Sequence, residues 1–203
     1  MSPLNFKKSA DKYLQKKWYS ILSDIIFVLL VLLLIIPSTR TEVASFFIRL
    51  TSLPPSTLEA DEQIKINIQS KNWNILDMDG NTISLESLNE KPIFLNFWTT
   101  WCPPCIAELP GIEELHKKYG SEMNFVLVSD EPRAKVRAFA KKKEFEGLPF
   151  YQNKSVPNDF SSQSIPTTFI ISKEGTIVLS KKGVAKWNSG RVEDIIENLI
   201  SDR

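Results

Sequence analysis

The chain has 203 residues, of which 42% are hydrophobic and 24% charged, a mixture typical of one globular domain with an appendage. Its 25 basic and 24 acidic residues leave a net charge of +1, which argues against a nucleic-acid-binding protein. With two cysteines and one histidine, the chain has few side chains from which to build a metal site.

The amino terminus carries five lysines between residues 7 and 17, followed by a largely apolar run from 18 to 36. That run is about long enough to cross a bilayer as a helix, and lysines on one side place that side in the cytoplasm. We therefore expect a cytoplasmic tail at 1–17, an uncleaved signal anchor at 18–36, and the remaining chain outside. A cleaved signal peptide stays an alternative, although Ala44 and Ser45, the small residues suited to cleavage, lie well beyond the apolar run.

Residues 37–67 give weaker signals and are expected to link the anchor to a domain at 68–203. An apolar series with helical spacing permits a short amphipathic helix along the membrane surface before Pro54 and Pro55, but we favour an ordinary tether. The series consists of Val43, Phe46, Phe47, Leu50 and Leu53. Three isoleucines spaced by two, at 64, 66 and 68, predict a strand that leads into the domain.

The first half of the domain begins with a predicted hairpin. Asp79 and Gly80 form its turn within residues 73–85, because this pair adopts a tight turn readily. Residues 92–98 form an apolar run typical of a strand buried on both faces, and it leads directly into the stretch that holds both cysteines. A helix with an apolar face follows and ends near Gly120.

The second half continues with alternating elements. A strand at 124–129 and a lysine-rich helix at 132–145 imply parallel pairing with the preceding strand. A short strand at 149–151, an antiparallel hairpin at 167–181 and a last helix with an apolar stripe between 192 and 200 complete the domain.

Cys102 and Cys105 are separated by two residues, so on the first turn of a helix they can close a small reversible disulfide ring. Pro103 and Pro104 suit the first helical positions, where no backbone N–H is needed. The free N–H groups and the dipole of this helix lower the pKa of a thiol beside them. We therefore expect Cys102 to be the nucleophile and the more shielded Cys105 to resolve a mixed disulfide.

Three alternative roles fit the cysteine pair less well. A structural zinc ion takes four ligands, and beyond the pair the chain offers His116 and no further cysteine. A structural disulfide across so short a loop stabilises little, because the gain grows with loop length. A pair of inert thiols fits a reducing compartment, whereas the predicted anchor places the domain in an oxidising one.

The order of elements, with WCPPC at the end of a central strand and SIPTTFIIS before a hairpin, resembles the thioredoxin fold, a central mixed β-sheet flanked by helices. More narrowly, FWTTWCPPCIAELP is similar to the membrane-anchored thioredoxin-like disulfide reductases of the TlpA and ResA type, which share an anchor, a proline-rich CxxC and a nearby glutamate. The resemblance covers about residue 68 to the end, with an added amino-terminal β-hairpin. It implies no cofactor and no metal, and a cis peptide between Ile165 and Pro166.

The resemblance also implies the substrate contacts. Substrate is expected to meet the ring of Trp101, although simple core packing is an alternative for this side chain. The remaining expected contacts come from the prolines of the motif and from the backbone of the cis-proline loop: Pro103, Pro104, Ile165, Pro166 and Thr167.

Glu108 lies three residues after Cys105, so on a helix it returns to the same face. Plain thioredoxins carry an aspartate where this chain has Asn96, which cannot ionise. We therefore predict that Glu108 is the catalytic acid/base group, with an exposed helix glutamate as the alternative. His116 is expected at the surface of the same helix.

These observations together predict a membrane-anchored thiol-disulfide oxidoreductase that faces the periplasm from the bacterial inner membrane. By resemblance it reduces disulfides in exported proteins, apocytochrome c among them, and receives electrons from a membrane thiol-transfer protein. Its other expected partner is the lipid bilayer, through residues 18–36, and no nucleic acid is expected. The alternatives are a disulfide-donating oxidase and a copper metallochaperone, with a peroxidase rated lowest.

Overall fold

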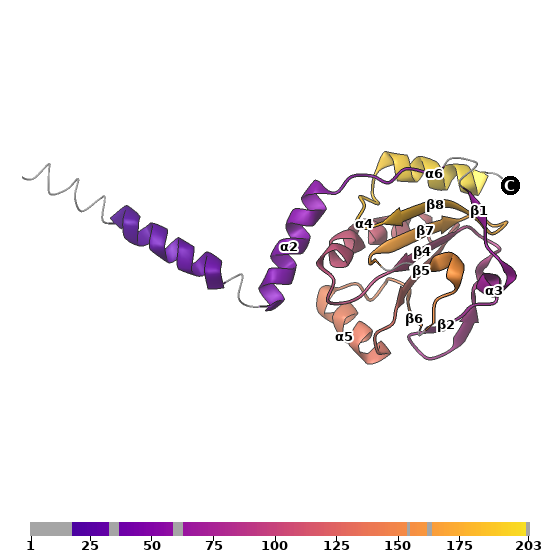
Figure 1. Ribbon diagram of the computed structural model, residues 1–203, viewed down its shortest axis with the longest axis horizontal. Helices are drawn as coiled ribbons and strands as arrows, with labels where there is room; N and C mark the ends of the chain where they lie inside the picture. Colours follow the sequence, from indigo (N-terminus) through magenta and orange to yellow (C-terminus); the bar gives the residue numbers. More distant parts are fainter. Residues whose placement is uncertain (1–17, 33–36, 59–62, 154, 162–163, 202–203) are drawn as a thin grey trace, which may run out of the picture. The chain divides into compact units, whose positions relative to one another are not determined.

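The computed structural model describes residues 18–32, 37–58, 63–153, 155–161 and 164–201. The chain divides after Val43 into two units, and the second, from Ala44 on, contains the whole β-sheet (Figure 1). Residues 18–32 are helical, whereas the expected tail at 1–17 and residues 33–36 of the expected anchor lie outside the described residues. Within the described ranges, no helix combines the length and the apolar character that spanning a membrane requires.

Helix α2 (Pro37–Thr51) occupies the segment before the two prolines, so the segment is helical and not the irregular tether that we favoured, whereas its place along a membrane surface stays a prediction. From Ala44 on, this helix belongs to the second unit, in which Ser45 is buried. Hydrogen bonds connect the segment to the rest of that unit: from the Ser45 hydroxyl to the Pro103 carbonyl (2.8 Å), from the Lys186 amide to the Leu53 carbonyl (2.9 Å) and from the Leu58 amide to the Val178 carbonyl (3.0 Å). The predicted domain start at residue 68 therefore lies inside this unit.

The strands form one eight-stranded sheet in the order β1-β8-β7-β4-β5-β6-β2-β3. In chain order they are β1 (Ile64–Lys65), β2 (Asn74–Asp77), β3 (Thr82–Ser84), β4 (Ile93–Phe97), β5 (Asn124–Ser129), β6 (Phe150–Gln152), β7 (Thr167–Ile171) and β8 (Thr176–Lys182). The pairs β4–β5 and β5–β6 are parallel and the other pairs are antiparallel, so the expected mixed sheet is confirmed. The predicted hairpin is also confirmed, as β2–β3 joined at the edge of the sheet through β6.

The predicted strand through the three isoleucines is shorter than expected. Only β1 pairs with the sheet, and the short helix α3 (Ile68–Lys71) begins at the third isoleucine. Asn67 caps this helix by accepting a hydrogen bond from the Ser70 amide, and a capped turn ends the extended conformation.

Three longer helices cover one face of the sheet, α4 (Pro103–Tyr119), α5 (Arg133–Lys143) and α6 (Gly190–Ser201). The other face is covered by residues from the 3₁₀ turns η1 (Leu85–Leu88) and η2 (Asn158–Phe160) and from around α3. Central strand β4 separates the two cores because its residues alternate: Phe94 packs in the core beneath the three helices, and Leu95 packs in the opposite core. Asn96 consequently points toward the α4 side.

This arrangement confirms the thioredoxin-like α/β fold. Strand β4 runs directly into α4, and β7 lies beside β4 in antiparallel register, with Phe97 opposite Thr167. The end of the central strand, the start of α4 and the loop before β7 therefore meet at one edge of the sheet, which positions the site.

Candidate active site

The cysteine pair lies at the amino terminus of α4, where Cys102 is the capping residue and the two prolines occupy the first positions. The two cysteines form a disulfide, and both are buried, with Cys102 3% exposed and Cys105 fully enclosed. The Cys105 amide donates to the Cys102 sulfur at 3.3 Å. On reduction, this N–H and the helix terminus stabilise a thiolate at Cys102, the sulfur nearer to the surface.

The peptide between Ile165 and Pro166 is cis, as the resemblance predicted. It brings the loop before β7 against the cysteines, so that the Ile165 carbonyl oxygen lies 3.9 Å from the Cys102 sulfur. A backbone that passes this close to the nucleophile is suited to pairing with an extended substrate segment beside it.

A hollow of about 260 Å³ opens next to the motif, lined by residues that include Trp101, Val156, Phe160 and Ile165. Trp101 is 62% exposed, so simple core packing is wrong for this side chain. Its indole and the Ile165 side chain border the same space, which suits contact with an apolar side chain of a bound peptide.

The other residues expected to contact substrate are less accessible. Pro103 and Pro104 are half-buried on the first turn of α4. Pro166 is buried, and Thr167 lies inside the sheet between β4 and β8, with its hydroxyl donating to the Ser164 carbonyl at 2.7 Å. Substrate contact by these residues stays a prediction.

Glu108 is 3% exposed, so the exposed-glutamate alternative is wrong. Its Oε1 accepts a hydrogen bond from the Asn96 side-chain amide (2.8 Å), and its Oε2 accepts from the indole N–H of Trp187 (3.0 Å) and the amide of Ala185 (3.3 Å). Burial disfavours the charged form and raises the pKa of Glu108 to about 8, although the hydrogen bonds from Trp187 and Asn96 oppose this rise. A carboxyl group that titrates in this range can exchange a proton with a thiol.

Asn96 links this carboxyl group to the sheet. Its side-chain amide also donates to the Thr168 hydroxyl on the neighbouring strand at 2.8 Å. Among the described residues, nothing hydrogen-bonds its Oδ1 atom, so the side chain acts here as a donor. The asparagine that replaces the aspartate of plain thioredoxins therefore supports Glu108 instead of carrying a proton itself.

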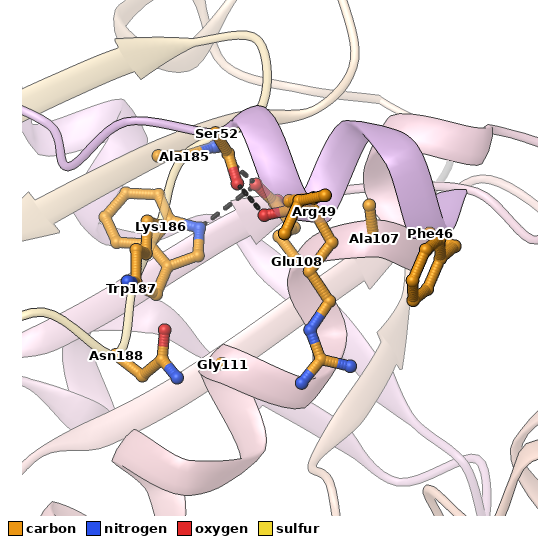
Figure 2. A pocket seen from close by; sticks show the side chains of 11 residues that line it. Phe46, Arg49, Ser52, Ala107, Glu108, Gly111, Ala185, Lys186, Trp187 and Asn188 are labelled. Atoms are coloured by element: carbon orange, nitrogen blue, oxygen red, sulfur yellow. Dashed lines mark hydrogen bonds between the residues drawn. The ribbon is translucent and has the colours of Figure 1, made fainter. Parts of the chain in front are cut away.

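A second cavity, of about 330 Å³, is lined in part by Glu108. Residues of α2, α4 and the loop between β8 and α6 line it, and Figure 2 shows the Glu108 carboxyl group hydrogen-bonded within it, with Arg49 from α2 nearby. The largely buried Glu108 carboxyl group therefore borders this cavity while its oxygens accept hydrogen bonds from Asn96, Trp187 and Ala185.

Sequence reasoning missed two contributors to the site. Trp187, which donates to Glu108, lies far along the chain and gave no local signal. Glu131 is a second buried carboxyl group, which contacts Thr100 just before the cysteines. It follows the strand next to β4 in a parallel pair, and because the carboxyl ends of neighbouring parallel strands meet at one edge, this position was a usable signal.

His116 is half-buried, and its ring packs against Phe125 with the ring centres 5.2 Å apart. Its place on α4 is as expected, although it is less exposed than a surface residue. Burial lowers the pKa of this imidazole. In the part of the chain that the structure describes, no group of three or more His, Cys, Asp or Glu side chains is arranged to hold a metal ion.

Comparison with known proteins gives matches at three levels. Residues 66–180 match the AhpC/TSA family. The thiol-disulfide oxidoreductase ResA of Bacillus cereus is 34% identical over 68% of this chain and 80% of its own length. The thioredoxin-like protein YneN of Bacillus subtilis is 32% identical over 54% of this chain and 66% of its own length. The crystal structure of a secreted thiol-disulfide isomerase from Corynebacterium glutamicum, 16% identical, superimposes with a TM-score of 0.55 over 74% of this chain and 99% of the isomerase, a similarity of fold alone.

Proposed function

Since the chain belongs to the AhpC/TSA family and is a thiol-disulfide oxidoreductase similar to ResA, we propose that it reduces disulfides in exported proteins. The observation that carries this proposal is the cysteine pair at the start of α4, held against the cis-proline loop with a buried carboxyl group one turn further along. Apocytochrome c is the substrate that the resemblance favours, and a membrane thiol-transfer protein is the implied electron donor.

The reaction begins when the Cys102 thiolate attacks one sulfur of a substrate disulfide. A bond forms between Cys102 and that sulfur, and the other substrate sulfur leaves as a thiolate and takes a proton. Cys105 then loses its proton and attacks the Cys102 sulfur, which releases the second substrate thiol. Two electrons have passed from the protein to the substrate, and the protein is left with the Cys102–Cys105 disulfide, the state in the structure.

Glu108 is suited to take the proton of Cys105 in the second step. It lies one helical turn from Cys105, and its pKa of about 8 is close to the ordinary value of a thiol, about 8.5. Proton transfer between groups of matched pKa needs little free energy, so the transfer does not oppose the attack. With the disulfide closed, the carboxyl group holds its proton at neutral pH.

The direction of electron flow is tested by the reduction potential of the cysteine pair in the full chain, measured by equilibration with a dithiol buffer and trapping of the thiols. A potential near that of thioredoxin, about −270 mV, is expected of a reductase. A potential tens of millivolts above the range of glutathione, about −220 to −260 mV, identifies a disulfide donor and contradicts the proposal.

Substrate attack is tested by trapping. Cys105→Ser leaves Cys102 to form a mixed disulfide that cannot be resolved, so adducts with exported disulfide proteins are expected to accumulate, whereas Cys102→Ser forms none. Equal adduct yields from the two variants would contradict the assignment of Cys102 as nucleophile. Glu108→Gln is expected to slow reduction of insulin and to shift the pH profile, and unchanged kinetics would remove its role.

Anchoring through residues 18–36, with the catalytic domain facing the periplasm, is the remaining part of the proposal. The lysines before this apolar run support a cytoplasmic amino terminus. The full chain, expressed in a bacterium, is expected to sediment with membranes after alkaline extraction, and protease added to spheroplasts is expected to cleave the catalytic domain. Recovery of the protein in the extract would contradict the anchor.

A further inference from the structure

Glu131 is a buried carboxyl group beside the cysteine motif that the proposed chemistry does not use. It follows β5 and is 7% exposed. Its Oε2 accepts the backbone N–H of Thr100 at 2.6 Å, and its Oε1 accepts the hydroxyl of the same residue at 2.9 Å. Both polar groups of Thr100 that can donate are therefore held by one side chain.

The Glu131 carboxyl group is itself fixed in place. The Lys135 ammonium group, from the first turn of α5, lies 2.5 Å from Oε1. The Glu131 amide donates to the Ser129 hydroxyl (3.2 Å), and its carbonyl accepts from the Gln152 side chain on β6 (3.0 Å). Burial opposes ionisation, but the hydrogen bonds from Lys135 and Thr100 outweigh it and hold the pKa of Glu131 below its usual range, so the group is a carboxylate at neutral pH.

Thr100 lies in the short link between β4 and the first cysteine. The link is held at its start by the Trp98 amide, which donates to the Val128 carbonyl on β5 (3.1 Å), and at its end by the Cys102 amide, which donates to the Thr99 carbonyl (3.4 Å). Between these points the Glu131 carboxylate is the contact that holds the backbone of Thr100. Hydrogen bonds to a charged acceptor are stronger than neutral ones, so this contact restrains the link.

We propose that Glu131 is a positioning residue for the nucleophile. By holding Thr100, it directs the link so that the Cys102 sulfur meets the Cys105 amide and the Trp101 ring borders the substrate hollow. The inference rests on the proposed function, in which Cys102 attacks the substrate. Glu131 contacts Thr100 and not the sulfur, so it acts through the geometry of the link.

The carboxylate has a second way to affect Cys102, through its charge, and the two effects have opposite signs. A negative charge nearby disfavours a thiolate, so loss of that charge would lower the pKa of the Cys102 thiol. Loss of the restraint weakens the contact between the sulfur and the Cys105 amide and therefore raises this pKa. The carboxylate bonds Thr100 directly but makes no contact with the sulfur, so we expect the positional effect to dominate.

The test measures the rate of iodoacetamide alkylation against pH in the full chain, with Cys105→Ser as the background so that Cys102 is the one remaining thiol. Glu131→Gln is nearly isosteric and is expected to raise the pKa of Cys102 by about half a unit, which lowers the thiolate fraction about threefold below that pKa. Glu108 is unchanged in every variant, so its influence cancels. An unchanged or lowered pKa in Glu131→Gln would overturn the inference.

Two matched sets of variants complete the design. Lys135→Met leaves both hydrogen bonds to Thr100 intact and removes one positive charge, so it is expected to change the pKa of Cys102 less than Glu131→Gln does. A larger change in Lys135→Met would show that charge at this distance outweighs the restraint and would contradict the positioning role. Thr100→Val removes the hydroxyl and is expected to give a smaller rise, and Thr100→Ser is expected to restore the original value. If Glu131→Gln does not fold, Thr100→Val takes its place as the test, and an unchanged pKa of Cys102 in Thr100→Val overturns the inference.

Failure of the inference can be told apart from failure of the proposed function. A parent chain that reduces insulin, combined with an unchanged pKa in Glu131→Gln, removes only the positioning role. A parent chain that does not reduce insulin while the pKa of Cys102 still responds to Glu131 removes the reductase function and leaves the positioning role standing.

Discussion

Replacing Glu108 with glutamine is expected to flatten the pH dependence of the protein's stability. With the disulfide closed, burial raises the pKa of this carboxyl group from 4.5 to about 8 in the folded chain. At a pH between 4.5 and about 8, Glu108 holds a proton in the folded protein that it has lost in the unfolded chain. Stability therefore falls as the pH rises through this window, because deprotonation favours the unfolded state.

The expected loss follows from the difference between the two pKa values. One proton corresponds to a slope of about 1.4 kcal/mol per pH unit, so the penalty reaches on the order of 5 kcal/mol above pH 8. Glutamine cannot ionise, and this contribution to the slope disappears. The glutamine NH₂ group must face one of the donors that now bind the carboxyl group, a pH-independent cost of about 1–3 kcal/mol, so the slope is the informative quantity.

The measurement is urea unfolding of the oxidised protein at several pH values between about 5 and about 8, for the parent chain and for Glu108→Gln. Glu114→Gln, at an exposed carboxyl group of the same helix that accepts a hydrogen bond from the Asn188 side chain, is measured alongside as the control for loss of one carboxyl group. If Glu108→Gln keeps the slope of the parent protein across this range, the reasoning from burial to a raised pKa is refuted.

Three further substitutions test other contacts of the domain. Asn96→Ala removes a hydrogen bond that favours the charged form of Glu108, so the pKa of that carboxyl group should rise above about 8, and a lower value measured by NMR titration would count against this contact. Ser45→Ala removes the buried hydrogen bond to Pro103 and should lower the free energy of unfolding by about 1 kcal/mol in urea titrations, whereas no change would mean that α2 does not dock there. Gly80→Ala places a side chain at a φ of +99° and against Arg133, so it should lower the melting temperature, and an unaltered melting curve would argue against this turn.

Local patterns in the sequence predicted most of the sheet and the longer helices. The buried runs at 93–97 and 124–129 are strands β4 and β5, and Gly120 caps the helix that begins at the cysteines. The strand predictions hold because a strand buried on both faces has a continuous apolar run, and the helix start is predicted because the fixed φ of proline suits the first helical positions. Gly120 ends the helix at an ordinary right-handed φ of −63°, where a Cβ would lie 2.6 Å from the His116 carbonyl oxygen.

The segment before the domain shows where such patterns are insufficient. The spacing of apolar residues in 43–53 allowed a helix, but it contained no information about what the helix would contact. Ser45, a small polar residue with no periodic signal, is the buried one, whereas Phe46 and Phe47 are exposed. The buried side of the helix is the one on which the Ser45 hydroxyl donates to the Pro103 carbonyl, and Pro103 is 58 positions away in the sequence.

The sequence by itself determined the redox centre, since two cysteines one helical turn apart, separated by prolines and preceded by a buried strand, define their chemistry through local geometry. The sequence also singled out Glu108 by its helical spacing from Cys105, but only the tertiary structure buried this carboxyl group and brought Glu131 against the link before Cys102. Glu108 and Glu131 resemble many other glutamates in the sequence, and they become buried and differ in pKa only when Trp187 and Thr100 are brought against them. Desolvation and hydrogen bonding depend on such distant partners, and for this reason they cannot be read from the neighbouring residues.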